Sequence, residues 1–247
     1  MRASAIEFRL RGIILTFLVL LGFWAPWIQA LDLGKRVSLL EWLALEMSRA
    51  GLLSFLYATP VVIAAGTLLA ALGMLLRVSG TAYMGSRAVN SRRMQAPRLV
   101  ACGPYRYVRN PLYLGSWFML AAIAFLMPPT GALVALPLIA LFLLRLVLGE
   151  EAFLAAELGD PYRAYQRAVP RLLPRLRSDL PSGGEAPRWL LALLTELNAI
   201  SVFIVLAAIS WTYDHELMIK ALLVGFGISL VARALVSEKA PADALHA

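Results

Sequence analysis

The stretch GPYRYVRNPLYLG, residues 103–115, stands between a basic segment and a long apolar run. Its two prolines, Pro104 and Pro111, fix φ, and each disfavours a helical conformation at the residue before it. Only six residues lie between them, so we predict an irregular backbone that enters a membrane helix near Pro111. Irregular backbone at membrane depth must be buried in protein or line a polar cavity, because lipid cannot satisfy its hydrogen bonds. The stretch therefore predicts a polar site at the membrane surface, with two arginines and an asparagine amide beside it.

The chain as a whole has the composition of a membrane protein. Its 247 residues are 60% hydrophobic and 15% charged, with a mean hydropathy of +0.74. A helix needs about 20 apolar residues to cross a bilayer. The sequence Pro128-Pro129-Thr130-Gly131 interrupts the longest apolar run and predicts two short spans joined by a tight turn. We predict an all-α, polytopic fold with about six spans, in residues 12–31, 51–76, 112–144 (two spans), 189–211 and 217–231.

The net charge of +8 is distributed in a way that favours a membrane partner over nucleic acid. Residues 77–109 contain seven arginines and no acidic residue, so this segment is expected to stay on the cytoplasmic side. Arginines next to anionic headgroups are favourable by roughly 1 kcal/mol each. We therefore expect an integral multi-pass protein of a bacterial inner membrane, with both termini in the cytoplasm and no nucleic-acid partner.

An adjacent acidic pair, Glu150-Glu151, closes the long apolar run. Carboxylates directly after a membrane span are costly unless they have partners. Neighbours on a helix point about 100° apart, so one glutamate can face a ligand while the other pairs with an arginine such as Arg109 or Arg145. Two interpretations remain open: a ligand site shared with residues 103–115, or a solvated helix end beside an aromatic belt with lipid-anchoring arginines.

An amphipathic helix is predicted shortly after the acidic pair. Asp160-Pro161 is typical of a helix start, because Asp caps free backbone N–H groups and Pro fits the first helical position. Tyr162, Tyr165 and Val169 recur at helical spacing on one face, which predicts an interfacial helix with its apolar side toward lipid or the hairpin.

Three blocks follow from this organisation. The first block is residues 1–100, with two spans and the basic loop. The second is residues 101–174, with residues 103–115 (hereafter the motif), the pair of short spans in residues 112–144 (the hairpin) and the acidic pair. The third is residues 175–247, with a linker and a C-terminal pair of spans. In the last block Glu196 and Asn198 lie inside a predicted span, where acidic residues are by default functional or paired. They could polarise a channel or make a structural bond to a neighbouring helix, and the sequence does not decide between the two.

The middle block resembles the isoprenylcysteine carboxyl methyltransferase and phospholipid methyltransferase superfamily. The resemblance covers residues 101–174 and extends to the span before them. It rests on the composite spacing of several motifs, since no single piece is specific. These motifs are Gly103-Pro104-Tyr105-Arg106-Tyr107-Val108-Arg109-x-Pro111-x-Tyr113-x-Gly115, Glu150-Glu151, Gly159-x-x-Tyr162-x-x-Tyr165 and Val169-Pro170-Arg171.

The resemblance implies an integral membrane enzyme that uses S-adenosylmethionine without a Rossmann domain, with residues 101–174 as its cofactor-binding module. Arg109 and Glu150 would be catalytic. At position 110 the family usually has His, whereas this chain has Asn, which forms hydrogen bonds but cannot take up a proton near neutrality. We expect Asn110 to orient the cofactor. The cofactor-binding residues would be Gly103, Pro104, Tyr105, Arg106, Arg109, Asn110, Pro111, Tyr113, Gly115, Glu150 and Glu151.

The methyl acceptor is not specified by the sequence. A lipophilic or membrane-delivered carboxylate, thiol or amine remains open, and so does the oligomeric state. A second hypothesis is an NADPH-dependent membrane reductase of the sterol or enone type, and a third is a transporter or assembly factor without a cofactor. No metal site is expected, because the chain has only two histidines and one cysteine, Cys102.

Overall fold

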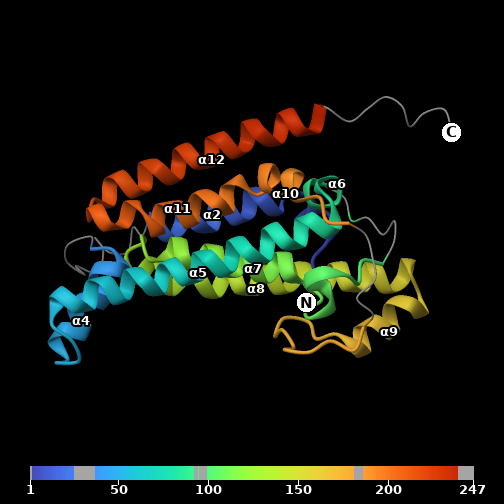
Figure 1. Ribbon diagram of the computed structural model, residues 1–247, viewed down its shortest axis with the longest axis horizontal. Coiled ribbons are helices and arrows are strands. Elements are labelled where there is room, and N and C mark those ends of the chain that lie inside the picture. The colour runs from blue at the N-terminus through green and yellow to red at the C-terminus, as the bar shows by residue number, and fades with distance from the viewer. Residues whose placement is uncertain (1, 25–36, 92–93, 95–98, 181–185, 239–247) are drawn as a thin grey trace.

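The computed structural model describes residues 2–24, 37–91, 94, 99–180 and 186–238, and in these segments every regular element is a helix (Figure 1). The predicted all-α class is therefore confirmed. The helices are α1 (Ala5–Arg9), α2 (Arg11–Phe23), α4 (Leu39–Arg49), α5 (Phe55–Met84), α6 (Ser86–Asn90), η1 (Gly103–Arg106), α7 (Pro111–Ala124), α8 (Pro129–Glu157), α9 (Asp160–Ala168), α10 (Trp189–Thr195), α11 (Leu197–Ala207), η2 (Ile209–Thr212) and α12 (His215–Glu238).

The long helices run roughly parallel along the longest axis of the molecule (Figure 1). By length and composition, α5, α8 and residues 215–235 of α12 could each cross a membrane. The pair of α10 and α11 is a fourth candidate only if it counts as one span bent by 72°. The helices α2 and α7 are apolar but have only 13 and 14 residues, and part of the predicted span 12–31 lies outside the described residues. The prediction of about six spans is thus not confirmed.

Helix α5 extends further than the sequence predicted. It ends at Met84, so Arg77 belongs to the helix and not to the basic loop assigned to residues 77–109. A charge normally marks the end of a span, but here the guanidinium is largely buried and paired with a carboxylate. The ion pair compensates the charge, and the helix continues for two further turns.

The predicted hairpin is present and is made of α7 and α8. The chain turns at residues 125–128, and Pro129 occupies the first turn of α8, where its missing N–H leaves no donor unsatisfied. The second arm is not the short span predicted to end at residue 144. Helix α8 has 29 residues and carries Glu150 and Glu151 within its last two turns.

Helix α7 packs closely against α5 because two glycines face each other at the crossing. A Cβ on Gly115 would lie 2.9 Å from the Gly73 carbonyl oxygen, and one on Gly73 would lie 2.8 Å from the Met119 nitrogen. Neither position has room for a side chain, so this contact fixes the distance between α7 and α5.

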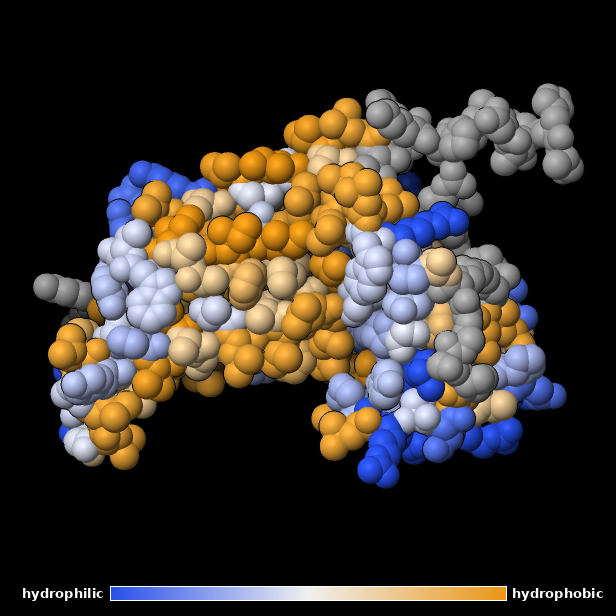
Figure 2. Space-filling view, in the orientation of Figure 1, coloured by the Kyte–Doolittle hydropathy of each residue, from blue (hydrophilic) through white to orange (hydrophobic). Residues whose placement is uncertain are grey.

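The surface is apolar along the middle of the helices and hydrophilic toward the ends, as Figure 2 shows for one face. Large apolar side chains are exposed on α2, α5, α8 and α12, among them Phe17, Leu56, Leu68, Leu133 and Leu223. An exposed apolar band between two polar ends is typical of a protein embedded in a bilayer.

One end of the bundle collects the elements that the sequence placed near the polar site. The C-terminal ends of α5, α8 and α12, the start of α7, and α9 all lie at this end (Figure 1). Helix α9 begins with Asp160, with Gly159 as its N-cap, and therefore one residue earlier than the predicted Asp cap. Its apolar face, Tyr162 and Tyr165 followed by Val169, packs against the end of α8 as expected for the hairpin alternative.

Candidate functional site

The backbone between the two prolines is irregular, as predicted. A single 3₁₀ turn, η1, is followed by a non-helical segment that reaches α7 at Pro111. Gly103 begins this turn with φ +55°, and a Cβ there would overlap the ring of Tyr83, so the position requires glycine. The Tyr165 hydroxyl donates to the Tyr105 carbonyl oxygen at 2.7 Å and ties the turn to α9. Burial raises the pKa of both Tyr105 and Tyr165, so both phenols stay protonated.

Glu151 is the centre of a buried polar cluster that joins the motif to α8. Its side chain accepts hydrogen bonds from the Arg109 guanidinium at 3.0 and 3.3 Å and from the Asn110 amide at 2.9 Å. The guanidinium of Arg171, which follows α9, forms a third contact at 2.9 Å. Because only 3% of Glu151 is exposed, these donors neutralise a carboxylate that lacks water.

The remaining donors of Arg109 bind backbone. Its Nη1 donates to the carbonyl oxygens of Gln166 and Val169, and its backbone N–H donates to the Pro170 carbonyl at 2.9 Å. A guanidinium has five N–H donors, and four hydrogen bonds are made here. Arg109 therefore fastens the segment after α9 to the motif.

Glu150 has the opposite environment. It accepts one hydrogen bond, from the Tyr113 hydroxyl at 2.7 Å, and forms no ion pair with any described residue. The sequence predicted that one glutamate would pair with an arginine while its neighbour faced a ligand. The pairing is present between Glu151 and Arg109, and a ligand contact of Glu150 stays a prediction. The carboxylate left without a cation lines the large cavity described next.

A cavity of about 1640 Å³ opens between α2, α7, α8 and α12. It is lined mainly by apolar side chains. Its acidic group and several arginines lie toward the end of the bundle where η1 and α9 lie, and Ser38 and His215 line the opposite end. Such a composition is typical of a ligand site, in which a few polar groups fix the orientation of an otherwise apolar ligand. Six of the predicted cofactor residues line it: Tyr105, Arg109, Asn110, Pro111, Tyr113 and Glu150.

Residues 61–160 match the phospholipid methyltransferase family. The match contains the motif, the hairpin and the acidic pair, and it ends at the start of α9. A Protein-S-isoprenylcysteine O-methyltransferase of Schizosaccharomyces pombe is 34% identical over 110 residues, which cover 42% of this chain and 45% of that protein. The chain thus aligns with less than half the length of this relative. No solved structure matches the chain. The resemblance predicted from the motifs is confirmed for this superfamily.

Other predicted site residues do not line the cavity. Arg106 donates to the Leu180 carbonyl oxygen and so holds the linker before α10 against η1. Gly115 is at the crossing with α5, and Gly103 and Pro104 shape the turn before the site. These four residues and Glu151 hold the elements that carry the cavity-lining residues, and a direct role in binding stays a prediction.

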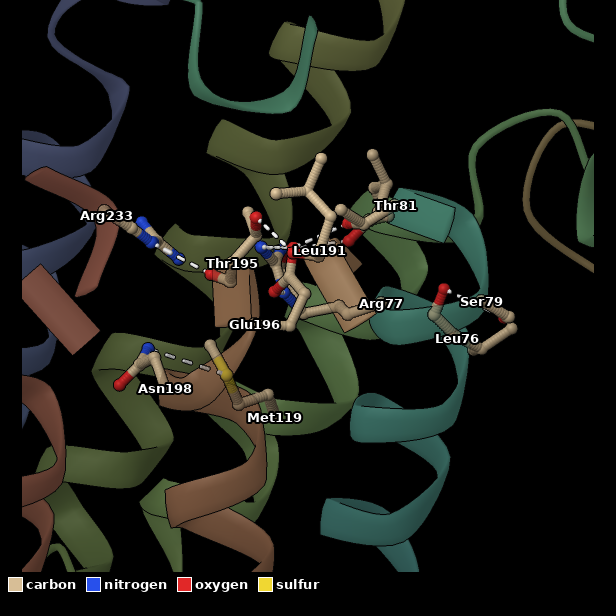
Figure 3. Close-up of polar contacts among 12 residues, drawn as sticks. Leu76, Arg77, Ser79, Thr81, Met119, Leu191, Thr195, Glu196, Asn198 and Arg233 are labelled. Atoms are coloured by element: carbon tan, nitrogen blue, oxygen red, sulfur yellow. Dashed lines mark hydrogen bonds and ion pairs between the residues drawn. The ribbon is translucent and has the colours of Figure 1, made fainter. Parts of the chain in front are cut away.

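Beyond the family match, the C-terminal helices add a second buried cluster. Glu196, which is fully buried at the bend between α10 and α11, accepts from Arg77 at 2.6 and 3.0 Å and from the Thr81 hydroxyl at 2.7 Å (Figure 3). Arg77 also donates to the Ser116 hydroxyl on α7. Of the two roles that the sequence left open for Glu196, the structure shows the bond to a neighbouring helix.

Four arginines of the cavity wall were not predicted as site residues: Arg9, Arg11, Arg77 and Arg233. Arg77 had been assigned to a loop. The acidic Glu196 inside a span could have revealed it, because an intramembrane carboxylate requires a cationic partner. Arg11 and Arg233 lie next to apolar runs in the sequence and carry no comparable signal.

Proposed function

We propose that this protein is a membrane methyltransferase that transfers a methyl group from S-adenosylmethionine to a lipophilic acceptor. The acceptor and the cofactor meet in the cavity, at the end of the bundle that holds η1 and α9. This end lies at the cytoplasmic surface, with both termini on that side. The match to the phospholipid methyltransferase family and the relative's name support the reaction class.

The observation that carries the proposal is the unpaired carboxylate of Glu150. S-adenosylmethionine has a sulfonium and an ammonium group, so a cavity that binds it needs an anionic group free of protein cations. Glu150 fits this requirement, because its described contacts include a neutral phenol and no ion pair. The Tyr113 hydroxyl fixes the position of one carboxylate oxygen, and the other oxygen is left for the cofactor's ammonium or ribose hydroxyls.

Arg109 and Asn110 act by positioning. All but one of the guanidinium donors are bound to Glu151 and to backbone carbonyls, which favours a structural role over the direct contact expected from the sequence. Asn110 donates to Glu151 and to the Arg171 carbonyl oxygen. An asparagine at this position satisfies both acceptors without a titratable proton, so its exchange for the family's histidine is compatible with binding.

The bound cofactor would supply the activated methyl group. The chain aligns the acceptor with it and keeps water out, and such alignment accounts for much of the rate in a displacement reaction. A carboxylate or thiolate acceptor would use its own lone pair to take the methyl group, and the cofactor would be released as a neutral thioether. This chemistry needs no base at position 110.

Cofactor binding to purified protein tests the proposal. Losing a hydrogen bond to a charged group costs about 1.5–3 kcal/mol, which corresponds to about ten- to hundredfold in affinity. We expect Glu150→Gln to weaken S-adenosylmethionine binding by that factor, and Tyr113→Phe to weaken it less. Glu157→Gln, on the exposed side of the same helix, is the matched control and should bind normally.

The same measurement separates the competing functions. Tight binding of NADPH together with no binding of S-adenosylmethionine would establish the reductase hypothesis instead. Equal affinities in Glu150→Gln and Glu157→Gln would show that the carboxylate does not contact the cofactor. A labelled-methyl assay against total membrane lipids then identifies the acceptor fraction.

A further inference from the structure

The cavity wall carries a second kind of unpaired charge, at the bend between α10 and α11. At this bend Glu196 is neutralised by Arg77, as described above. A second arginine, Arg233 on α12, approaches the same place and donates through Nε to the Thr195 carbonyl oxygen at 3.1 Å (Figure 3). That carbonyl ends α10, where the break leaves backbone acceptors without their usual helical partners.

The terminal nitrogens of Arg233 have no hydrogen-bond partner among the described residues. They are not enclosed by protein, and Arg233 lines the cavity. Because the one carboxylate at the bend is already bonded to Arg77 and Thr81, the bend holds two guanidinium groups and a single acidic side chain. One positive charge is therefore left facing the cavity.

The other arginines on this wall are occupied or exposed. Arg109 and Arg77 are paired with carboxylates. Arg11 donates to three backbone carbonyls and lies over the Phe8 ring. Arg9 also lines the cavity, but it is exposed to solvent. Among the partly buried arginines of this wall, Arg233 thus has the most N–H donors available for a ligand.

Asn198 adds a neutral donor and acceptor to the same cavity wall. Its amide nitrogen contacts only the Met119 sulfur, at 3.8 Å, and a thioether is a weak acceptor. Figure 3 shows Asn198 and Arg233 on the same side of Glu196, away from the body of α5. Both residues line the cavity, and apolar side chains of α12 (Leu222, Leu223, Phe226 and Leu230) continue the wall from Arg233 toward the middle of the bundle.

We propose that Arg233 and Asn198 form a subsite for the anionic headgroup of a lipid, a phosphate or carboxylate, whose chain lies along the apolar wall of α12. Three features fit this ligand: an unbalanced cation, an amide with free hydrogen-bonding capacity, and an apolar channel that begins next to them. A guanidinium binds planar or tetrahedral oxyanions through paired N–H groups. The subsite lies outside the residues that match the family.

The proposal rests on the proposed function in one respect, since it identifies the methyl acceptor as an acidic amphiphile. The cation at Arg233 and the anion at Glu150 line one cavity, so they would receive oppositely charged partners. The negative headgroup would bind at the C-terminal helices, and the positive cofactor would bind at the motif.

Lipid binding in the absence of cofactor tests the subsite directly. Dioleoylphosphatidic acid and dioleoylglycerol have the same chains and differ in the phosphate. We would titrate both into the purified protein in a nonionic detergent and count bound lipid by native mass spectrometry. We expect the wild-type protein to prefer phosphatidic acid by about tenfold or more, the effect of a charged hydrogen bond.

The variants make the result specific. Arg233→Gln should remove the preference, Arg233→Lys should restore much of it because the charge returns, and Asn198→Ala should reduce it severalfold. Arg167→Gln removes an exposed arginine that does not line the cavity and should leave the preference intact. Inorganic phosphate should not displace the lipid, because it lacks the chain.

Two results would overturn the subsite: an equal preference in wild type and Arg233→Gln, or displacement of the lipid by inorganic phosphate at the concentration of the lipid itself. Binding of S-adenosylmethionine is measured on the same samples. If Arg233→Gln loses the lipid preference and keeps cofactor affinity, the subsite is supported. If no variant binds the cofactor while the lipid preference follows Arg233, the proposed reaction fails and the lipid site stands.

Discussion

The buried pair of Arg77 and Glu196 allows a quantitative test of how the C-terminal helices are attached. Glu196 has no exposed surface, and the Arg77 side chain is 14% exposed. The two groups share two hydrogen bonds at 2.6 and 3.0 Å. Removing one partner of such a pair leaves a buried charge without compensation, which destabilises proteins by about 3–5 kcal/mol. We therefore expect Glu196→Gln to lower the free energy of unfolding by that amount.

A double-mutant cycle separates the pair from its surroundings. We expect Arg77→Met to cost about as much as Glu196→Gln, and the double variant to cost less than the sum by about 2 kcal/mol or more, because neither charge is then stranded. The assay is the unfolding free energy of detergent-solubilised protein, with denaturant or heat. The exposed pair of Glu46 and Arg49, whose side chains are 40% and 65% exposed, serves as the control and should couple by less than about 1 kcal/mol.

Additive single effects would refute this reasoning. So would a Glu196→Gln variant as stable as wild type, because a buried carboxylate bonded to one guanidinium cannot be replaced by a neutral amide without leaving the guanidinium unpaired. Either result would mean that water or lipid headgroups reach the bend and solvate the charges.

Three other changes test separate contacts. Gly73→Ala puts a methyl group against the α7 backbone and should lower stability by about 1–3 kcal/mol, whereas Gly227→Ala, with open space around it, should not; unfolding midpoints decide. Arg109→Lys loses the forked contact to Glu151 and two backbone carbonyls, so amide hydrogen exchange after α9 should accelerate, and the exposed Arg163→Lys should leave it unchanged. Tyr165→Phe removes one buried hydrogen bond and should cost about 0.5–1.5 kcal/mol in unfolding free energy.

The hairpin and the irregular motif could be predicted because their signals are local. Proline restricts its own φ and the residue before it, so the break at Pro128 and Pro129 and the start of α7 at Pro111 follow from the sequence alone. The length of α5 could not be predicted in this way. It depends on Glu196, which lies 119 residues away and neutralises the charge at which a span would otherwise end.

The different environments of Glu150 and Glu151 were predictable from helix geometry, since neighbouring side chains point in different directions. Which glutamate faces the cavity required the structure, because it depends on how α8 is rotated against η1 and α9. The same holds for Arg106 and Gly115. Their positions in the motif suggest ligand contact. In the structure Arg106 donates to the Leu180 carbonyl oxygen, and Gly115 lies at the crossing of α7 and α5.

The distribution of compensated and uncompensated charge links the fold to the proposed chemistry. Glu151 and Glu196 anchor two buried clusters, and each is matched by at least one guanidinium within hydrogen-bonding distance. These clusters fix the motif to α8 and the C-terminal helices to α5. Glu150 and Arg233 are different: both line the cavity, and neither forms an ion pair with a described residue.

Leaving a charge uncompensated beside an apolar cavity destabilises the empty protein. A ligand of opposite charge recovers that free energy when it binds, so the affinity of the site depends on charges that the fold itself does not neutralise. Neutralising each of the two charges in a separate variant tests this directly. Glu150→Gln should affect only the cationic cofactor and Arg233→Gln only the anionic lipid; a loss of both ligands in either variant would show that the two groups serve one structural cluster instead.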